Sequence, residues 1–227
     1  MNFQAELDKI LKSIEVEYQI DKKLDNKIAR KPKLLLHACC GPCSSYVLEY
    51  LNGFFDITIF YYNPNIHPEA EYTRRLEELE NFLPAFTKNF ENPNITLIKE
   101  DYNPEDFYTA IKIRENPELA KEREKGERCF RCYEFRLKKA FEYAKENAFD
   151  YFCTTLSISP FKDAEKINVI GELLEKTHRE NNPTDFCPKW LISDFKKKGG
   201  FQRSLEISNE YDLYRQQYCG CVYSKNQ

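Results

Sequence analysis

The sequence predicts an α/β protein built on an open, mostly parallel, Rossmann-like sheet flanked by helices. Short apolar or β-branched segments alternate along the chain with longer segments whose apolar residues recur at helical spacing. Such alternation is typical of parallel strands joined by right-handed helical crossovers. A helical N-terminal extension precedes this region and a cysteine-bearing C-terminal segment ends it, so we expect two additions to one sheet.

Four segments have the composition of strands. The first is the apolar run Leu34–Leu36, and the others, at 56–62, 95–98 and 150–156, are rich in β-branched or aromatic residues. Helices are expected at 46–51, 69–82, 105–125 with a break at 116–117, 128–144, 164–179 and 205–214. The apolar pattern weakens after residue 181, where only the last of these helices is expected.

The first 32 residues are expected to form the helical extension, and residues 33–227 a single α/β catalytic domain. Leu7, Ile10, Leu11 and Ile14 recur at helical spacing, and a Lys-rich stretch then leads to Pro32. The chain begins with early acidic residues and no apolar block. We therefore expect neither a signal peptide nor a membrane span, and a cytoplasmic location.

The composition restricts the classes of function. With 227 residues and 41% hydrophobic content, the chain can bury a substantial core. Its formal net charge of −3 gives no overall basic field, so binding a polyanion would need a local basic patch. Nine cysteines in a reducing compartment argue against a disulfide scaffold and favour metal binding or redox catalysis.

The first cysteine cluster comes where the first predicted strand meets a helix. Cys39, Cys40 and Cys43 lie there, and the positive end of a helix dipole favours the thiolate that a nucleophile or a metal ligand requires. Cys40 and Cys43 also form a Cys-Gly-Pro-Cys motif of the thioredoxin type. Cys39 is surplus to a dithiol enzyme, so the pattern predicts sulfur chemistry without deciding its kind.

Two further cysteine pairs follow. Cys129 and Cys132 again begin a helix, and their spacing suits half of a zinc knuckle or half of an iron-sulfur ligand set. Their equivalent placement allows a four-thiolate site shared with Cys39 and Cys40. The tighter Cys219-Gly220-Cys221 suits two thiols that converge on a metal or form a strained disulfide. Cys153 and Cys187 are expected to be buried or incidental.

Two polar residues have both a structural and a catalytic interpretation. His37 is either a core histidine at a strand end or a proton donor beside the thiols. Asp163 follows Ser-x-Ser-Pro-Phe-Lys, where it could cap a helix or act as a catalytic acid.

One local basic patch stands out. It comprises Lys162, Lys196, Lys197, Lys198 and Arg203, with the aromatic residues Trp190, Phe195 and Phe201 interleaved. Basic and aromatic side chains together suit a stacked, single-stranded RNA loop. The alternative is an ordinary solvated surface.

Five motifs occur in an order that resembles one known family. They are HACCGPCS at 37–44, RCFRC at 128–132, TTLSISPFKD at 154–163, FKKKGGFQRS at 195–204 and YCGC at 218–221. Between about Lys33 and Tyr223 the chain resembles the cobalamin-independent epoxyqueuosine reductases. The resemblance implies an oxidoreductase that deoxygenates epoxyqueuosine, at the wobble position of tRNA, to queuosine.

The resemblance also implies a cofactor and site residues. A 4Fe-4S cluster would take its ligands from Cys39, Cys40, Cys129 and Cys132, with no cobalamin. Cys219 and Cys221 would be catalytic, as a redox-active pair or as ligands of a second, mononuclear iron, with Asp163 or His37 as proton donor. Whether Cys43 belongs to the ligand set is left open.

The implied partners are the anticodon loop of tRNAs with GUN anticodons and an external low-potential electron donor. The donor is external because the chain has no Gly-rich nucleotide-binding loop. Two rival interpretations remain from the residues alone. One is a zinc-stabilised RNA-binding module, and the other is a thiol-disulfide oxidoreductase that uses Cys40 and Cys43.

Overall fold

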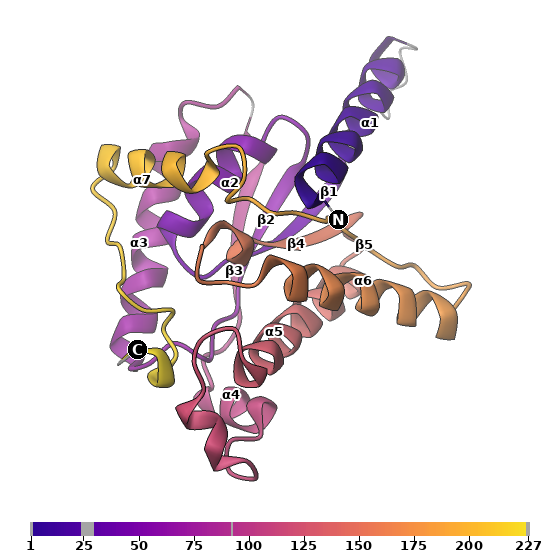
Figure 1. Ribbon diagram of the computed structural model, residues 1–227. Coiled ribbons are helices and arrows are strands. Elements are labelled where there is room, and N and C mark those ends of the chain that lie inside the picture. Colours follow the sequence, from indigo (N-terminus) through magenta and orange to yellow (C-terminus); the bar gives the residue numbers. More distant parts are fainter. Residues whose placement is uncertain (1, 24–29, 92, 226–227) are drawn as a thin grey trace.

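The computed structural model describes residues 2–23, 30–91 and 93–225. Its centre is a five-stranded sheet in which every pairing between the described strands is parallel, in the order β3-β2-β1-β4-β5 (Figure 1). The strands are β1 (Lys33–His37), β2 (Asp56–Tyr61), β3 (Ile95–Lys99), β4 (Tyr151–Thr154) and β5 (Lys189–Trp190). The chain winds outward from β1 on one side and then from β4 on the other, which confirms the predicted α/β fold.

Helices cover both faces of the sheet (Figure 1). They are α1 (Phe3–Lys23), α2 (Gly41–Leu51), α3 (Glu69–Thr87), α4 (Pro104–Ile111), α5 (Glu127–Glu146), α6 (Ala164–Asn181) and α7 (Gly200–Glu210). Three short 3-10 turns are η1 (Pro117–Lys121), η2 (Thr155–Ile158) and η3 (Val222–Ser224). None of the helices in the described part of the chain has the length and apolar character needed to cross a bilayer.

The central strand β1 is buried on both faces, as its continuous apolar run requires. Side chains alternate along a strand, so Leu34 and Leu36 pack in the cluster formed with α1, α2, α3 and α7, whereas Leu35 packs in the cluster formed with α5 and α6. All three leucines are completely buried. Each contributes about 1.5–3 kcal/mol of burial free energy, which fixes the register of the strand that carries the first cysteines.

The predicted N-terminal helix packs on this domain. Leu7, Leu11 and Ile14 of α1 are buried in the first cluster, and Asp8 accepts a hydrogen bond of 2.9 Å from the Tyr50 hydroxyl of α2. Residues 1 and 24–29 of the predicted extension lie outside the described residues. The division of the chain at residue 32 stays a prediction.

The largest departure from the predicted elements is β5. Lys189 and Trp190 pair with Tyr151 and Phe152 of β4, at a place for which no element was predicted. A two-residue strand has no alternating pattern to detect. The break predicted at 116–117 is confirmed, since α4 ends at Ile111 and η1 starts at Pro117.

Candidate metal and catalytic site

A cavity of about 700 Å³ lies beyond the carboxyl ends of β1 and β4. This is where the strand order reverses, the usual ligand site of open α/β sheets. Six cysteines from three distant segments line it: Cys39, Cys43, Cys129, Cys132, Cys219 and Cys221. The fold therefore brings all three predicted cysteine clusters to one place.

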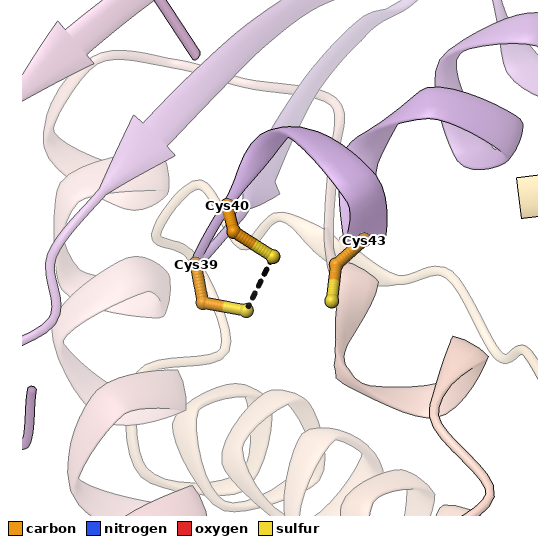
Figure 2. Close-up of side chains that lie close together, drawn as sticks. All are labelled: Cys39, Cys40 and Cys43. Atoms are coloured by element: carbon orange, nitrogen blue, oxygen red, sulfur yellow. Dashed lines mark hydrogen bonds between the residues drawn. The ribbon is translucent and has the colours of Figure 1, made fainter. Parts of the chain in front are cut away.

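The first cluster connects β1 to α2. Cys39, Cys40 and Cys43 have their Sγ atoms within 4.8 Å of one another, and Cys39 Sγ lies 3.8 Å from Cys40 Sγ (Figure 2). Cys40 is the N-cap of α2 and its backbone is extended, while Pro42 in the first turn is well suited to starting a helix. The three sulfurs are close enough to hold a metal ion.

Proton sharing makes Cys39 the most acidic thiol of this cluster. Hydrogen bonds from Cys40 and Cys43 hold the pKa of Cys39 well below its ordinary value. Burial raises the pKa of Cys40 to about 12. The hydrogen bond between Cys43 and Cys39 raises the pKa of Cys43. The cluster is thus set up to carry one thiolate that accepts hydrogen bonds from two thiols.

Two buried arginines place positive charge beside these sulfurs. Arg75 of α3 is fully buried, pairs with Glu71 at 2.7 Å, and donates hydrogen bonds of 3.3 Å to the carbonyls of Tyr218 and Cys219. Arg136 of α5 is 3% exposed and lowers the pKa of Cys39 together with Arg75. Buried cations of this kind offset the cost of burying thiolates.

The second pair lies at the start of α5. Cys129 and Cys132 are buried, and burial raises the pKa of Cys129 and raises that of Cys132 to about 11. Cys132 and Cys221 belong to the same small apolar cluster, which joins α5 to the end of the chain. Cys132, a member of the predicted ligand set, therefore packs in the same cluster as Cys221 of the Cys-Gly-Cys segment.

The Cys-Gly-Cys segment needs its glycine. Gly220 has a φ of +103°, and a Cβ there would lie 2.7 Å from Ile66 Cγ1. Its carbonyl accepts a hydrogen bond of 2.8 Å from the amide of His67. Both flanking cysteines are free thiols, and a hydrogen bond from Cys221 holds the pKa of Cys219 well below its ordinary value.

A family model described as "Epoxyqueuosine reductase QueH" matches residues 34–227. The chain belongs to the epoxyqueuosine reductase QueH family. It is 38% identical over 226 residues to the Epoxyqueuosine reductase QueH of Staphylococcus aureus, a match that covers 100% of this chain and 86% of that protein. It is 41% identical over 202 residues to that of Streptococcus pyogenes, covering 89% of this chain and 74% of the relative.

A third relative is less similar in sequence. The Epoxyqueuosine reductase QueH of Thermotoga maritima is 31% identical over 194 residues, which cover 84% of this chain and 89% of the relative. Among solved structures, the U34-tRNA thiolase NcsA from Methanococcus maripaludis with its [4Fe-4S] cluster has a TM-score of 0.44 and 12% identity, covering 94% of this chain and 69% of that one. That likeness is too distant to bear on the site.

In this QueH chain, Lys162 faces the cavity and Asp163 does not line it. Lys162 is 8% exposed, and its Nζ lies 3.3 Å from Glu124 Oε1. Burial acts to lower the pKa of Lys162, but the charges of Cys219, Tyr133 and Glu124 raise it overall, so the ammonium form is favoured. Asp163 caps α6, where its Oδ1 accepts hydrogen bonds of 3.1 Å from the amides of Glu165 and Lys166.

The predicted basic patch is wrong as a stacking surface. Trp190 and Phe195 are 5% and 1% exposed and belong to the core. Three of the basic side chains are paired with carboxylates: Lys196 with Asp194, Lys198 with Asp8 and Arg203 with Glu49. Of the predicted patch, only Lys162 and Phe201 line the cavity.

His37 occupies a core position, the first of its two interpretations. It is completely buried, its Nδ1 lies 2.8 Å from Thr154 Oγ1, and burial lowers its pKa to about 3. Three residues beside the thiols were not predicted: Arg75, Arg136 and Gln216, whose Nε2 lies 3.0 Å from Cys40 Sγ. The local sequence around these three residues resembles that of exposed, charged helices and loops. Their burial beside the thiols could therefore not be predicted from the sequence.

Proposed function

We propose that this protein reduces epoxyqueuosine to queuosine, at the wobble position of tRNA, inside the cysteine-lined cavity. The observation that carries the proposal is the convergence of six cysteines on one cavity in a chain of the QueH family. The reaction breaks both C–O bonds of the epoxide and forms a carbon–carbon double bond. It consumes two electrons and two protons, and the oxygen leaves as water.

The donor set of the cavity fits an iron-sulfur cluster. It is rich in thiols, largely buried, and bordered by Arg75 and Arg136. Our proposed ligands of a 4Fe-4S cluster are Cys39, Cys129 and Cys132 of the cavity wall together with Cys40, whose Sγ lies 3.8 Å from Cys39 Sγ. Such a cluster, when bound, supplies electrons one at a time. Cys43 competes for a ligand position because its Sγ is within 4.8 Å of the first two sulfurs.

Cys219 and Cys221 are proposed as the second reductant, or as ligands of a mononuclear iron. As a pair of thiols they release two electrons and two protons when they join as a disulfide. An external low-potential donor would then reduce the pair for the next turnover. The support for this role is the hydrogen bond between the two thiols and their position on the cavity wall.

Lys162 is our candidate for the group that holds the epoxide oxygen. Its buried ammonium lines the same cavity as Cys129 and Cys219, so it can donate a hydrogen bond where negative charge develops as the C–O bond breaks. Asp163, one residue further along the chain, stays a candidate proton donor. Its hydrogen bonds to two amides of α6 already occupy one carboxylate oxygen.

The cavity volume suits a single nucleoside. Ligand pockets of about 300–1,000 Å³ hold small molecules of this size, and the cavity has about 700 Å³. The modified base of an anticodon loop with a GUN sequence would be splayed out of its stack to enter it.

Anaerobic purification followed by assay tests the proposal. The protein should be brown and contain iron, and with a low-potential reductant it should convert tRNA epoxyqueuosine to queuosine, detected by mass spectrometry of the nucleosides. A colourless protein with stoichiometric zinc and no turnover would establish the zinc-stabilised RNA-binding module instead.

Cysteine variants separate the remaining alternatives. Cys129→Ala should lose iron and activity, whereas Cys153→Ser, which changes a buried thiol outside the cavity, should retain both. Full activity of Cys129→Ala would favour a thiol-disulfide oxidoreductase that uses Cys40 and Cys43. Loss of the iron chromophore in Cys43→Ser would add Cys43 to the ligand set.

A further inference from the structure

The outer wall of the cavity carries two pairs of an aromatic ring and an arginine. Phe161 and Arg123 make up one pair, and Phe201 and Arg215 make up the other; all four residues line the cavity. Phe161 and Arg123 are exposed, in contrast to the buried thiols of Cys39, Cys129, Cys132 and Cys221. The cavity thus has a reactive interior of sulfur and an outer mouth, defined here by these four residues.

Phe161 is the most prominent apolar side chain of the mouth. It is 66% exposed, more than any other large hydrophobic side chain in the described ranges. Two hydrogen bonds hold the segment that follows Phe161 beside the residues that follow Arg123. Lys162 Nζ donates to Glu124 Oε1 at 3.3 Å, and Lys166 Nζ donates to the carbonyl of Lys125 at 2.6 Å. An exposed ring and an exposed guanidinium are therefore held on one side of the mouth.

The second pair is fixed more firmly. The Arg215 guanidinium carbon lies 5.8 Å from the centre of the Phe201 ring. Arg215 Nη1 also donates hydrogen bonds to Ser208 Oγ at 3.0 Å and to the carbonyl of Ser204 at 3.4 Å. These contacts hold the Arg215 side chain against Ser204 and Ser208 of α7, and neither of them is to a carboxylate.

We propose that Phe161 and Arg123 form a binding subsite for the nucleotide next to the base in the cavity: Phe161 stacks on its base and Arg123 contacts its phosphate. This rests on the proposed function, because it assumes an RNA loop as substrate. Aromatic rings stack on unpaired bases, and arginine binds phosphate. Paired carboxylates offset the charges of Lys196 and Lys198, so the arginines of the mouth supply positive charge that these ion pairs do not.

The subsite predicts a loss of RNA affinity on removal of either side chain. In the anaerobic holoenzyme, Phe161→Ala should weaken binding of a GUN anticodon stem-loop RNA by between about 5-fold and 150-fold, the range for one base stacked on an aromatic ring. Phe161→Trp should retain affinity. Phe186→Ala is the matched control, since Phe186 is 48% exposed and does not line the cavity.

Salt dependence tests the phosphate contact separately. Arg123→Ala should lower the slope of log affinity against log salt by about one, whereas Arg179→Ala, on the exposed face of α6, should not change it. Fluorescence anisotropy of labelled RNA measures both quantities, and unchanged iron content and unfolding midpoint show that each variant is folded.

The outcomes separate this inference from the function on which it rests. Wild-type protein that turns over, together with Phe161→Ala and Arg123→Ala variants that bind RNA normally, overturns the subsite alone. A wild-type protein with no reductase activity overturns the proposed function. If Phe161→Ala binds RNA normally but turns over slowly only with a protein electron donor, the mouth docks the donor and the subsite is refuted.

Discussion

Replacing Gly220 by alanine tests how the third cysteine segment is held. The glycine lies between Cys219 and Cys221 with a φ of +103°, and its carbonyl accepts a hydrogen bond from His67. Alanine adds a single methyl group and changes no charge, so any effect comes from backbone strain and crowding. The variant therefore asks whether the position of the two thiols depends on this one backbone conformation.

The expected magnitude comes from two contributions. Holding a residue with a side chain in this backbone region costs roughly 1–3 kcal/mol. The new Cβ would also lie 2.7 Å from Ile66 Cγ1 and 3.2 Å from Arg75 Nη1. Both neighbours are fully buried, and crowding of this kind costs about 1–3 kcal/mol. Because residues 218–225 supply no strand of the sheet, the segment can relieve this strain by detaching without unfolding the sheet.

We therefore expect Gly220→Ala to lose turnover while keeping its iron absorbance. Cys219 should react faster with a thiol reagent, measured by mass spectrometry of the labelled peptide. Gly53→Ala is the control, because a Cβ there meets nothing within 4 Å, and it should match the wild type. Wild-type turnover and wild-type Cys219 reactivity in Gly220→Ala would refute the argument.

Three other variants probe the site and the fold. The Cys219→Ser/Cys221→Ser double variant should keep the cluster absorbance and lose turnover; loss of the absorbance would make these thiols cluster ligands. Asp163→Asn can still cap α6, so we expect wild-type stability; lost turnover would identify Asp163 as the proton donor, and wild-type turnover would rule it out. Burial acts to raise the pKa of Asp150, but hydrogen bonds from Arg30 and the backbone lower it overall. The stabilisation by ionised Asp150 is therefore present at neutral pH and is lost as the pH falls through the unfolded-state pKa and then the folded-state pKa. Asp150→Asn should lower the unfolding free energy by about 1 kcal/mol at pH 7 and by less at acidic pH. Urea titrations at the two pH values measure this difference.

Most of the sheet could be predicted because its strands carry local signals. The apolar run at Leu34–Leu36 is long enough to show burial on both faces, and β2 and β3 are rich in β-branched and aromatic residues. β5 was not predicted because a strand of two residues, which pairs with β4, is too short to show an alternating pattern. Its position is set by tertiary contacts, such as the packing of Trp190 in the second core cluster.

The same holds for the site: features set by neighbouring residues could be predicted, and features set by contacts between distant segments could not. Cysteine spacing and position at helix starts allowed the three clusters to be predicted, since both are properties of neighbouring residues. The basic patch failed in part because two of its charges are paired with residues far away in sequence: Asp8 pairs with Lys198, and Glu49 with Arg203. Neither pairing leaves a trace in the composition of residues 195–204.

Arg75 shows why the cavity is more than a collection of thiols. Its guanidinium lowers the pKa of Cys39, and it also binds the backbone carbonyls of Tyr218 and Cys219. One buried cation therefore supports the charge of the first cluster and anchors the segment that carries the last two thiols. Because burying a cation is costly, docking of that segment and ionisation of Cys39 each add to the stabilisation that Arg75 receives from Glu71. The sulfur chemistry of the first and third clusters is thus linked through α3, an element without a cysteine.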